Sequence, residues 1–156
     1  MKWYYIVSLI VIVLVATKVI NIPIPGGGYF NLGDAVVVFA GLYGGRKAGL
    51  IAGGIGSALA DILSGPYMIW APITFIAKAL EGWVCGFGKG QVGTIRMIYP
   101  VIGVMVMVIT YFFGAMLMPQ LGIGVAVADL PANIIQAVTG LLGGLALSRA
   151  MEKSGL

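Results

Sequence analysis

The sequence predicts an all-α integral membrane protein, with one membrane domain over residues 1–156 and six transmembrane helices. Hydrophobic residues make up 60% of the 156 residues and charged residues only 9%, and the mean hydropathy is +1.07. A soluble domain has about 25% charged residues, because its surface faces water. Lipid must therefore cover most of this surface. At about 20 residues for each spanning helix, plus short turns, six spans use up the chain.

Breaks rich in proline and glycine divide the chain into these six spans. The first apolar run follows Lys2, and the break after it contains Pro23, Pro25 and three consecutive glycines. No small-residue cleavage site follows this run, so we expect a retained helix and not a signal peptide. Later breaks lie at Gly44-Gly45, Ser64-Gly65-Pro66, Gly88-Lys-Gly90 and from Pro119 to Gly124. The expected helices are residues 3–20, 32–44, 47–63, 67–88, 96–118 and 125–147, the second being the shortest.

The basic residues predict the orientation. With six spans, seven of the nine fall on the side that carries both termini: Lys2, Arg46, Lys47, Lys89, Arg96, Arg149 and Lys153. Lys18 lies near the other side, and Lys78 lies within a span. Because lysine and arginine accumulate in cytoplasmic loops, we expect both termini in the cytoplasm and the loop 21–31 outside.

Polar side chains form stripes on three of the expected helices. Thr74, Lys78, Glu81 and Cys85 follow a 4-3-4 spacing, which keeps them on one helix face, and Asp129, Asn133, Gln136 and Gly140 repeat it. The fifth span adds Thr110 and Tyr111. A rise of about 1.5 Å per residue places Lys78, Gln136 and Thr110, one from each of these helices, in the outer half of the membrane. A charge at bilayer depth costs roughly 2.5–3.5 kcal/mol, so these groups indicate a polar pocket open to the outside, with Asp61 near its mouth.

Structural explanations compete with the pocket. Lys78 and Glu81 can neutralise each other at a spacing of three residues, and Asn133 and Gln136 can link neighbouring helices. Trp70 can anchor the helix at the membrane interface instead of stacking on a ligand ring. An aspartate near a helix start, such as Asp34, is explained by the free N–H groups there.

The third span carries small residues on two adjacent faces: Gly49, Gly53 and Ser57 on one, and Ala52, Gly56 and Ala60 on the other. Such spacing lets helix backbones approach closely in lipid. The small residues indicate either packing inside this chain or a contact surface for a separate membrane subunit.

Several classes of function are disfavoured. The chain has no histidine, and its one cysteine, Cys85, is expected to be a small packing residue. We therefore expect no disulfide, no metal site and no cofactor. The basic residues are scattered singly, which is not the pattern of a nucleic-acid-binding surface. An intramembrane enzyme is also disfavoured, because Asp34, Asp61 and Asp129 fall on the outer side, where no nucleotide substrate is available.

The chain resembles the substrate-binding S components of energy-coupling factor (ECF) vitamin transporters, the family that includes riboflavin-type members. The resemblance rests on Asn31-Leu-Gly-Asp34, Ala40-Gly-Leu-Tyr-Gly44, Gly53-Gly-Ile-Gly-Ser57-Ala-Leu-Ala-Asp61, Ser64-Gly65, Trp70-Ala-Pro72 and Lys78-Ala-Leu-Glu81-Gly82. It covers residues 21–90 well and the last third mainly in pattern. One departure is on the first helix, where Ala16 is followed four residues later by Ile20 and not by a second alanine.

The resemblance implies a six-helix S-component-like bundle in the bacterial plasma membrane, with no catalytic activity. Such a protein captures a water-soluble vitamin from outside and docks on a transmembrane coupling subunit that two cytoplasmic ATPases drive. The first three helices would face the coupling subunit, here through Gly49, Gly53, Ser57, Ala52, Gly56 and Ala60 of the third span. The outer loop and the last three helices would hold the ligand. Together with the polar stripes, this gives the expected ligand-binding residues Asn31, Asp61, Trp70, Thr74, Lys78, Glu81, Thr110, Tyr111, Asp129, Asn133 and Gln136.

The expected pocket is net acidic, since Asp61, Glu81 and Asp129 outnumber Lys78. That charge disfavours folate and pantothenate, and it favours a thiamine-precursor pyrimidine, a pyridoxine-type vitamin or riboflavin. The alternative function is a self-sufficient small channel or secondary carrier. It would need a polar path through both halves of the membrane.

Overall fold

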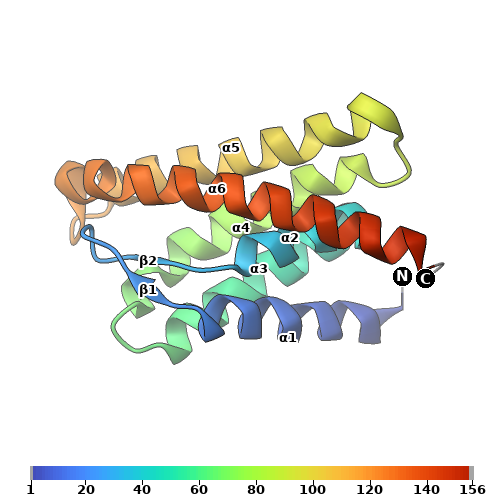
Figure 1. The fold of residues 1–156 in the computed structure, drawn as a ribbon. Helices are drawn as coiled ribbons and strands as arrows, with labels where there is room; N and C mark the ends of the chain where they lie inside the picture. The colour runs from blue at the N-terminus through green and yellow to red at the C-terminus, as the bar shows by residue number, and fades with distance from the viewer. Residues whose placement is uncertain (1, 155–156) are drawn as a thin grey trace.

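The computed structural model describes residues 2–154 and shows six helices in one bundle (Figure 1). They are α1 (Trp3–Val19), α2 (Gly33–Gly44), α3 (Arg46–Leu63), α4 (Ala71–Cys85), α5 (Gly93–Leu117) and α6 (Gly122–Lys153). Single 3-10 turns, η1 (Met68–Trp70) and η2 (Gly86–Gly88), extend α4 at both ends. Two short antiparallel strands, β1 (Ile22–Pro23) and β2 (Tyr29–Phe30), pair within the loop before α2.

A helix forms at each of the six expected positions. Three segments are long and apolar enough to cross a membrane, namely Met68–Gly88, Gly93–Leu117 and Gly122–Lys153, whereas α1 and α2 are shorter apolar helices. The sixth helix extends beyond the expected residue 147 to Lys153. Its last residues, Arg149 to Lys153, are good helix formers, so the helix continues past the apolar segment into the polar interface.

The helices form a closed ring in the order α1, α3, α4, α5, α6, α2, and α2 also touches α4 across the bundle.

α2 has only 12 residues, which is about 18 Å of helix against the roughly 30 Å of a bilayer core. Pro23, Pro25 and the glycines after them keep the preceding chain from continuing the helix. α2 therefore starts deep inside the bundle, and the loop 20–32 occupies the space above it.

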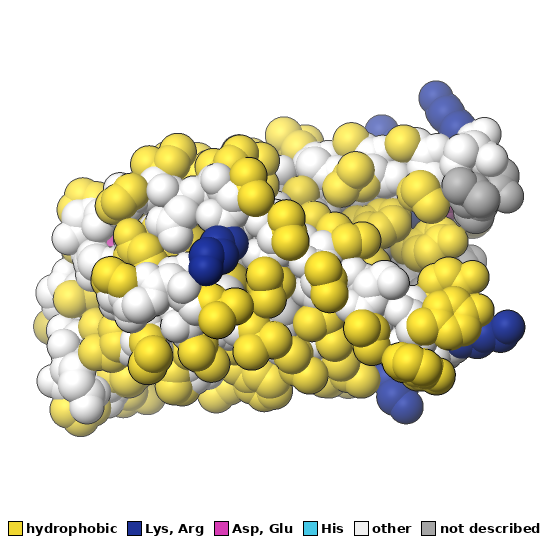
Figure 2. Space-filling model, turned by 90° about the horizontal axis from the view of Figure 1, so that it is seen from below, with side chains coloured by type: hydrophobic (Ala, Val, Ile, Leu, Met, Phe, Trp, Pro, Cys, Tyr) yellow, Lys and Arg dark blue, Asp and Glu magenta, His cyan; other side chains and the backbone are white. Residues whose placement is uncertain are grey.

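The two ends of the bundle differ. The N- and C-termini, the α2–α3 turn and the α4–α5 turn lie at one end, here called the terminal end, and the loop 20–32 lies at the other, the loop end (Figure 1). The seven basic residues predicted to share a side belong to the segments at the terminal end. Most lysine and arginine side chains visible in Figure 2 gather at one end, and hydrophobic side chains cover the flank between the ends. This surface suits a protein surrounded by lipid.

The small residues of α3 pack inside the chain. A Cβ atom added to Gly49 would lie 2.1 Å from the Gly82 carbonyl oxygen of α4, and one added to Gly56 would lie 2.8 Å from Val13 of α1. Each of the six small residues proposed to contact a partner subunit is buried within the chain: Gly49, Gly53, Ser57, Ala52, Gly56 and Ala60. Their spacing thus produces the internal helix contacts that were the other explanation of the pattern.

Candidate functional site

A polar cavity of about 30 Å³ lies at the loop end, between the start of α2 and the loop above it. The loop, α1, α3, the η1–α4 segment, α5 and α6 all contribute to its wall. Its lining residues are Thr17, Ile24, Gly28, Tyr29, Asn31, Ser57, Asp61, Trp70, Thr74, Lys78, Tyr111, Asp129, Asn133 and Gln136. Most of these side chains are polar or aromatic, in a chain that is otherwise mainly aliphatic.

A buried ion cluster forms the floor of the cavity. The Lys78 ammonium contacts a carboxylate oxygen of Asp34, and it lies 3.4 Å from Glu81 Oε2. Asp34 and Glu81 are fully buried, and the Lys78 side chain is 2% exposed. The Gln136 amide of α6 donates to Asp34 Oδ2 at 3.3 Å. The cluster thus joins α2, α4 and α6 through one cation, two carboxylates and one amide.

Asn31 orders the chain where it enters α2. Its side-chain oxygen accepts a hydrogen bond from the Gly33 backbone N–H at 2.8 Å. Its own backbone N–H donates to Gln136 Oε1 at 3.1 Å. Gln136 of α6 therefore bonds both Asn31, just before α2, and Asp34 in the first turn of α2, and it fixes the depth at which this short helix begins.

The loop is attached to the cavity wall at three places. The Tyr29 hydroxyl donates to Asp61 Oδ1 at 2.5 Å, and the Trp70 indole N–H donates to the Gly27 carbonyl at 3.2 Å. Burial, together with the Asp61 carboxylate, raises the pKa of Tyr29, so its hydroxyl stays protonated and remains a donor. The Asp129 carboxylate lies against the backbone of Gly26, where an added Cβ would be 1.8 Å from Oδ1.

Four polar groups on the wall lack a hydrogen-bond partner within residues 2–154. They are the hydroxyls of Thr17 and Ser57, Asp61 Oδ2 and Asp129 Oδ1. All four side chains are at least 97% buried and line the cavity. Because a buried polar group without a partner is costly, these groups can bind a polar ligand or water inside the cavity.

Nine of the eleven residues expected to bind a ligand line this one cavity: Asn31, Asp61, Trp70, Thr74, Lys78, Tyr111, Asp129, Asn133 and Gln136. Trp70 is 5% exposed, so it is part of the wall and not an anchor on the outer surface of the helix. The other two residues lie elsewhere. Glu81 is under the floor against Lys78, and the Thr110 hydroxyl donates to the Val106 carbonyl of its own helix at 2.7 Å.

Besides Ile24 and Gly28 of the loop, sequence reasoning missed four polar residues of the site. Asp34 was explained by the helix start, but its buried carboxylate pairs with Lys78 from 44 residues away. Thr17 and Tyr29 had no assigned role, and Ser57 was assigned to partner contact. The position of Lys78 within an apolar span could have indicated Asp34. An ammonium group has three donors, and Glu81 alone does not pair all of them, so a second buried acceptor was to be expected.

Apolar side chains fill the bundle between the ion cluster and the terminal end. Val38 and Leu42 of α2 pack there with Cys85, Val104 and Met107. A second group of buried residues surrounds Leu9 and Val37. The cavity is therefore closed toward the terminal end by an apolar core, and Cys85 is one of its packing residues.

Comparison with known proteins shows similarity to a family and to a relative. A model of the family described as "ECF-type riboflavin transporter, S component" matches residues 5–153. An uncharacterized protein of Pyrococcus woesei is 38% identical over 144 residues, which cover 90% of this chain and 95% of that protein. The family match spans all six helices except the first two residues of α1, and it includes every residue that lines the cavity.

Replacing Lys78 tests the ion cluster. Lys78→Met leaves Asp34 and Glu81 buried without a cation, and we expect it to lower the free energy of unfolding by about 3–5 kcal/mol. Adding Asp34→Asn and Glu81→Gln removes the uncompensated charges and should restore most of the loss. Thermal unfolding of the purified protein in detergent measures both effects. A Lys78→Met protein as stable as the parent would contradict the pairing.

Proposed function

The chain belongs to the family of ECF-type riboflavin transporter S components, and on that premise we propose that it captures a water-soluble vitamin or vitamin precursor. The loop end would face the outside, and both termini would be cytoplasmic. The protein itself catalyses no reaction. It would pass its ligand to a transmembrane coupling subunit driven by two cytoplasmic ATPases in the cell membrane.

One observation carries this proposal: the polar cavity lies directly under the loop, and the ion cluster and an apolar core separate it from the terminal end. A channel or a self-sufficient carrier needs a polar route through both halves of the bundle. A cavity with one entrance suits a binding subunit that depends on a partner to release its ligand inside. The positive-inside rule supports the orientation, because seven basic residues lie toward the terminal end.

The wall favours a ligand that is neutral or cationic and rich in hydrogen-bond donors. Within residues 2–154, Asp61 Oδ2 and Asp129 Oδ1 accept no hydrogen bond. The only cation on the wall, within residues 2–154, is Lys78, and Asp34 and Glu81 already neutralise it. Trp70 and Tyr111, with ring centroids 6.4 Å apart, provide aromatic faces beside these carboxylates. A thiamine-precursor pyrimidine, a pyridoxine-type vitamin and riboflavin each combine hydrogen-bond donors with an aromatic ring and carry no negative charge. An anionic vitamin would be repelled by the two carboxylates.

Binding a vitamin requires the loop to move. The cavity of about 30 Å³ is far smaller than the 300 Å³ or more of common ligand sites. The Tyr29–Asp61 and Trp70–Gly27 hydrogen bonds and the Gly26–Asp129 contact are the attachments that must yield. We therefore propose that the loop 20–32 is the gate of the cavity, and that its glycines allow the movement.

The contact with the coupling subunit needs positions that a partner can reach. The six small residues of α3 that we assigned to this contact are buried. Their role would therefore be indirect, in allowing α3 to pack closely on α1 and α4. Other side chains of α1 and α3 are accessible: Val11 of α1 is 53% exposed and Leu59 of α3 is 37% exposed. We propose that exposed faces of α1 and α3 make the contact.

Asn133→Ala tests the cavity as the ligand site. Mass spectrometry of compounds released from the denatured protein identifies the vitamin, and titration calorimetry measures its affinity. We expect roughly 10-fold weaker binding, because one hydrogen bond between ligand and wall is lost. The matched control is Thr139→Ala on the same helix, whose hydroxyl donates to the Ile135 carbonyl. Equal affinity in the parent and Asn133→Ala would place the ligand elsewhere.

Gly26→Ala tests the gate. The added methyl group would overlap the Asp129 carboxylate, at 1.8 Å from Oδ1, so either this carboxylate or the loop must shift and their contact is disrupted. We expect the vitamin to dissociate faster and to bind roughly 5- to 100-fold more weakly. Gly124→Ala is the control, because nothing lies within 4 Å of its Cβ position. Unchanged dissociation in Gly26→Ala would show that closure of the loop on Asp129 contributes nothing to retention.

A further inference from the structure

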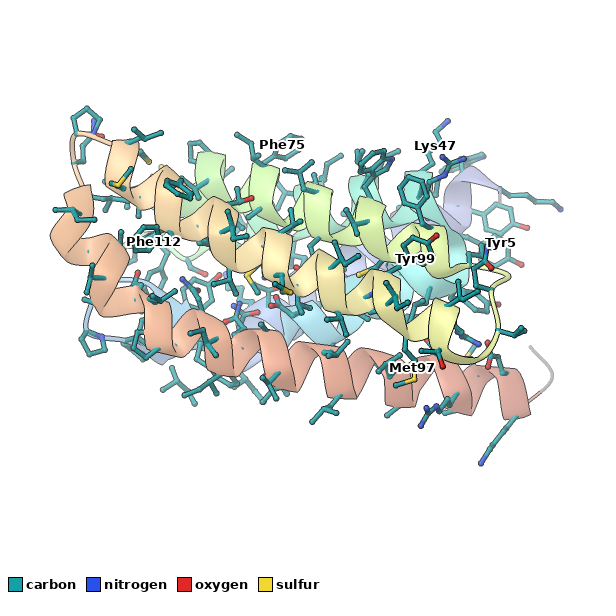
Figure 3. All side chains as sticks on the ribbon, turned by 90° about the horizontal axis from the view of Figure 1, so that it is seen from above. Tyr5, Lys47, Phe75, Met97, Tyr99 and Phe112 are labelled. Atoms are coloured by element: carbon teal, nitrogen blue, oxygen red, sulfur yellow. The ribbon has the colours of Figure 1, made fainter. Side chains whose placement is uncertain are left out.

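The seam between α5 and α6 contains two further pockets, one after the other along the same pair of helices. The polar pocket, of about 400 Å³, is lined by Gly93, Thr94, Arg96, Met97, Leu145, Ser148, Arg149 and Glu152. The apolar pocket, of about 340 Å³, is lined by Val101, Val104, Met105, Val108, Ile109, Ile134, Ala137, Val138 and Leu141. Figure 3 shows α5 and α6 side by side, with Met97 toward the terminal end and Phe112 toward the other.

The polar pocket has the chemistry of an anion site. Arg96 and Arg149 bring two positive charges, and Glu152 pairs with Arg96, which leaves a net charge of +1. The Ser148 side chain is only 2% exposed, and its hydroxyl has no hydrogen-bond partner in the described chain. The first residues of α5 add the Thr94 hydroxyl and the free N–H groups of a helix N-terminus. These donors converge on one volume large enough for a phosphate group.

The apolar pocket continues this site in the direction of the bilayer centre. Its nine lining side chains are all aliphatic or methionine, and Met105 and Val138 are 57% and 52% exposed on the lipid-facing surface. From Thr94 to Ile109 the helix rises about 22 Å, which matches one leaflet of a bilayer including its headgroup region. Charge and apolar surface are therefore arranged in the order found in a phospholipid molecule.

We propose that the α5–α6 seam binds an anionic phospholipid, with its phosphate at Arg149, Arg96 and Ser148 and an acyl chain in the apolar pocket. Basic pockets between membrane helices on the cytoplasmic side are typical sites for such headgroups. Free phosphate would use the polar pocket and leave the apolar pocket empty. The lipid site is separate from the vitamin cavity, which lies at the loop end among other residues.

Native mass spectrometry of the full chain in detergent tests this proposal, with dioleoyl phosphatidylglycerol and dioleoyl phosphatidylcholine titrated separately. We expect the phosphatidylglycerol to bind about five-fold more tightly, and Arg149→Gln to remove that preference. Lys47→Gln is the matched control, because it removes one positive charge at the same end from an exposed position on α3. Equal binding of the two lipids by the parent chain, or equal losses in Arg149→Gln and Lys47→Gln, would overturn the proposal.

Two further measurements separate a lipid from a free anion. Val138→Phe narrows the apolar pocket and should weaken dioleoyl phosphatidylglycerol while leaving a dihexanoyl analogue unaffected. Inorganic phosphate at 10 mM should displace little of the dioleoyl lipid, since it gains nothing from the apolar pocket. Complete displacement by phosphate, together with unchanged lipid binding in Val138→Phe, would show a simple anion site and contradict the proposal.

Discussion

The rest of the structure depends on one buried cation between two carboxylates. Lys78 lies at bilayer depth, where an unpaired charge is costly, and it contacts Asp34 and Glu81. Asp34 can reach it only because α2 is short and begins deep in the bundle. Gln136 bonds both Asp34 and the Asn31 backbone, so α6 is held to the same point. The depth of this cluster sets where the polar half of the bundle ends and the apolar half begins.

That division supports the proposal that this membrane protein binds a ligand without conducting it. Above the cluster, the loop replaces a helix and brings backbone and aromatic groups against Asp61, Asp129 and Trp70. Below it, α2 packs its aliphatic side chains against α4, α5 and α6. A binding subunit of this construction needs a partner protein to move its ligand across the membrane, as the family assignment implies.

Local patterns in the sequence predicted the six helices, the grouping of basic residues at one end and most of the cavity wall. The 4-3-4 spacings on α4 and α6 worked because helix periodicity alone decides which residues share a face. They placed Lys78 and Gln136 at one depth, and in the structure both contact Asp34. The segments rich in glycine and proline likewise predicted where each helix ends and the next begins.

Contacts between distant segments were beyond such reasoning. Asp34 has an ordinary local explanation, and its true partner lies 44 residues away. Thr17 is a single hydroxyl near the end of an apolar helix, with nothing in the pattern to mark it as cavity wall. The small faces of α3 fit two explanations, because close helix packing has the same spacing whether the neighbour is α4 or another protein.

Reconstitution of the purified chain in liposomes tests the central claim most directly, that the cavity has one entrance. With the radiolabelled vitamin outside, we predict about one bound molecule per chain and no accumulation in the lumen. Steady accumulation of the vitamin in the lumen without any partner subunit would contradict this account, because it would require a polar route through the apolar half of the bundle.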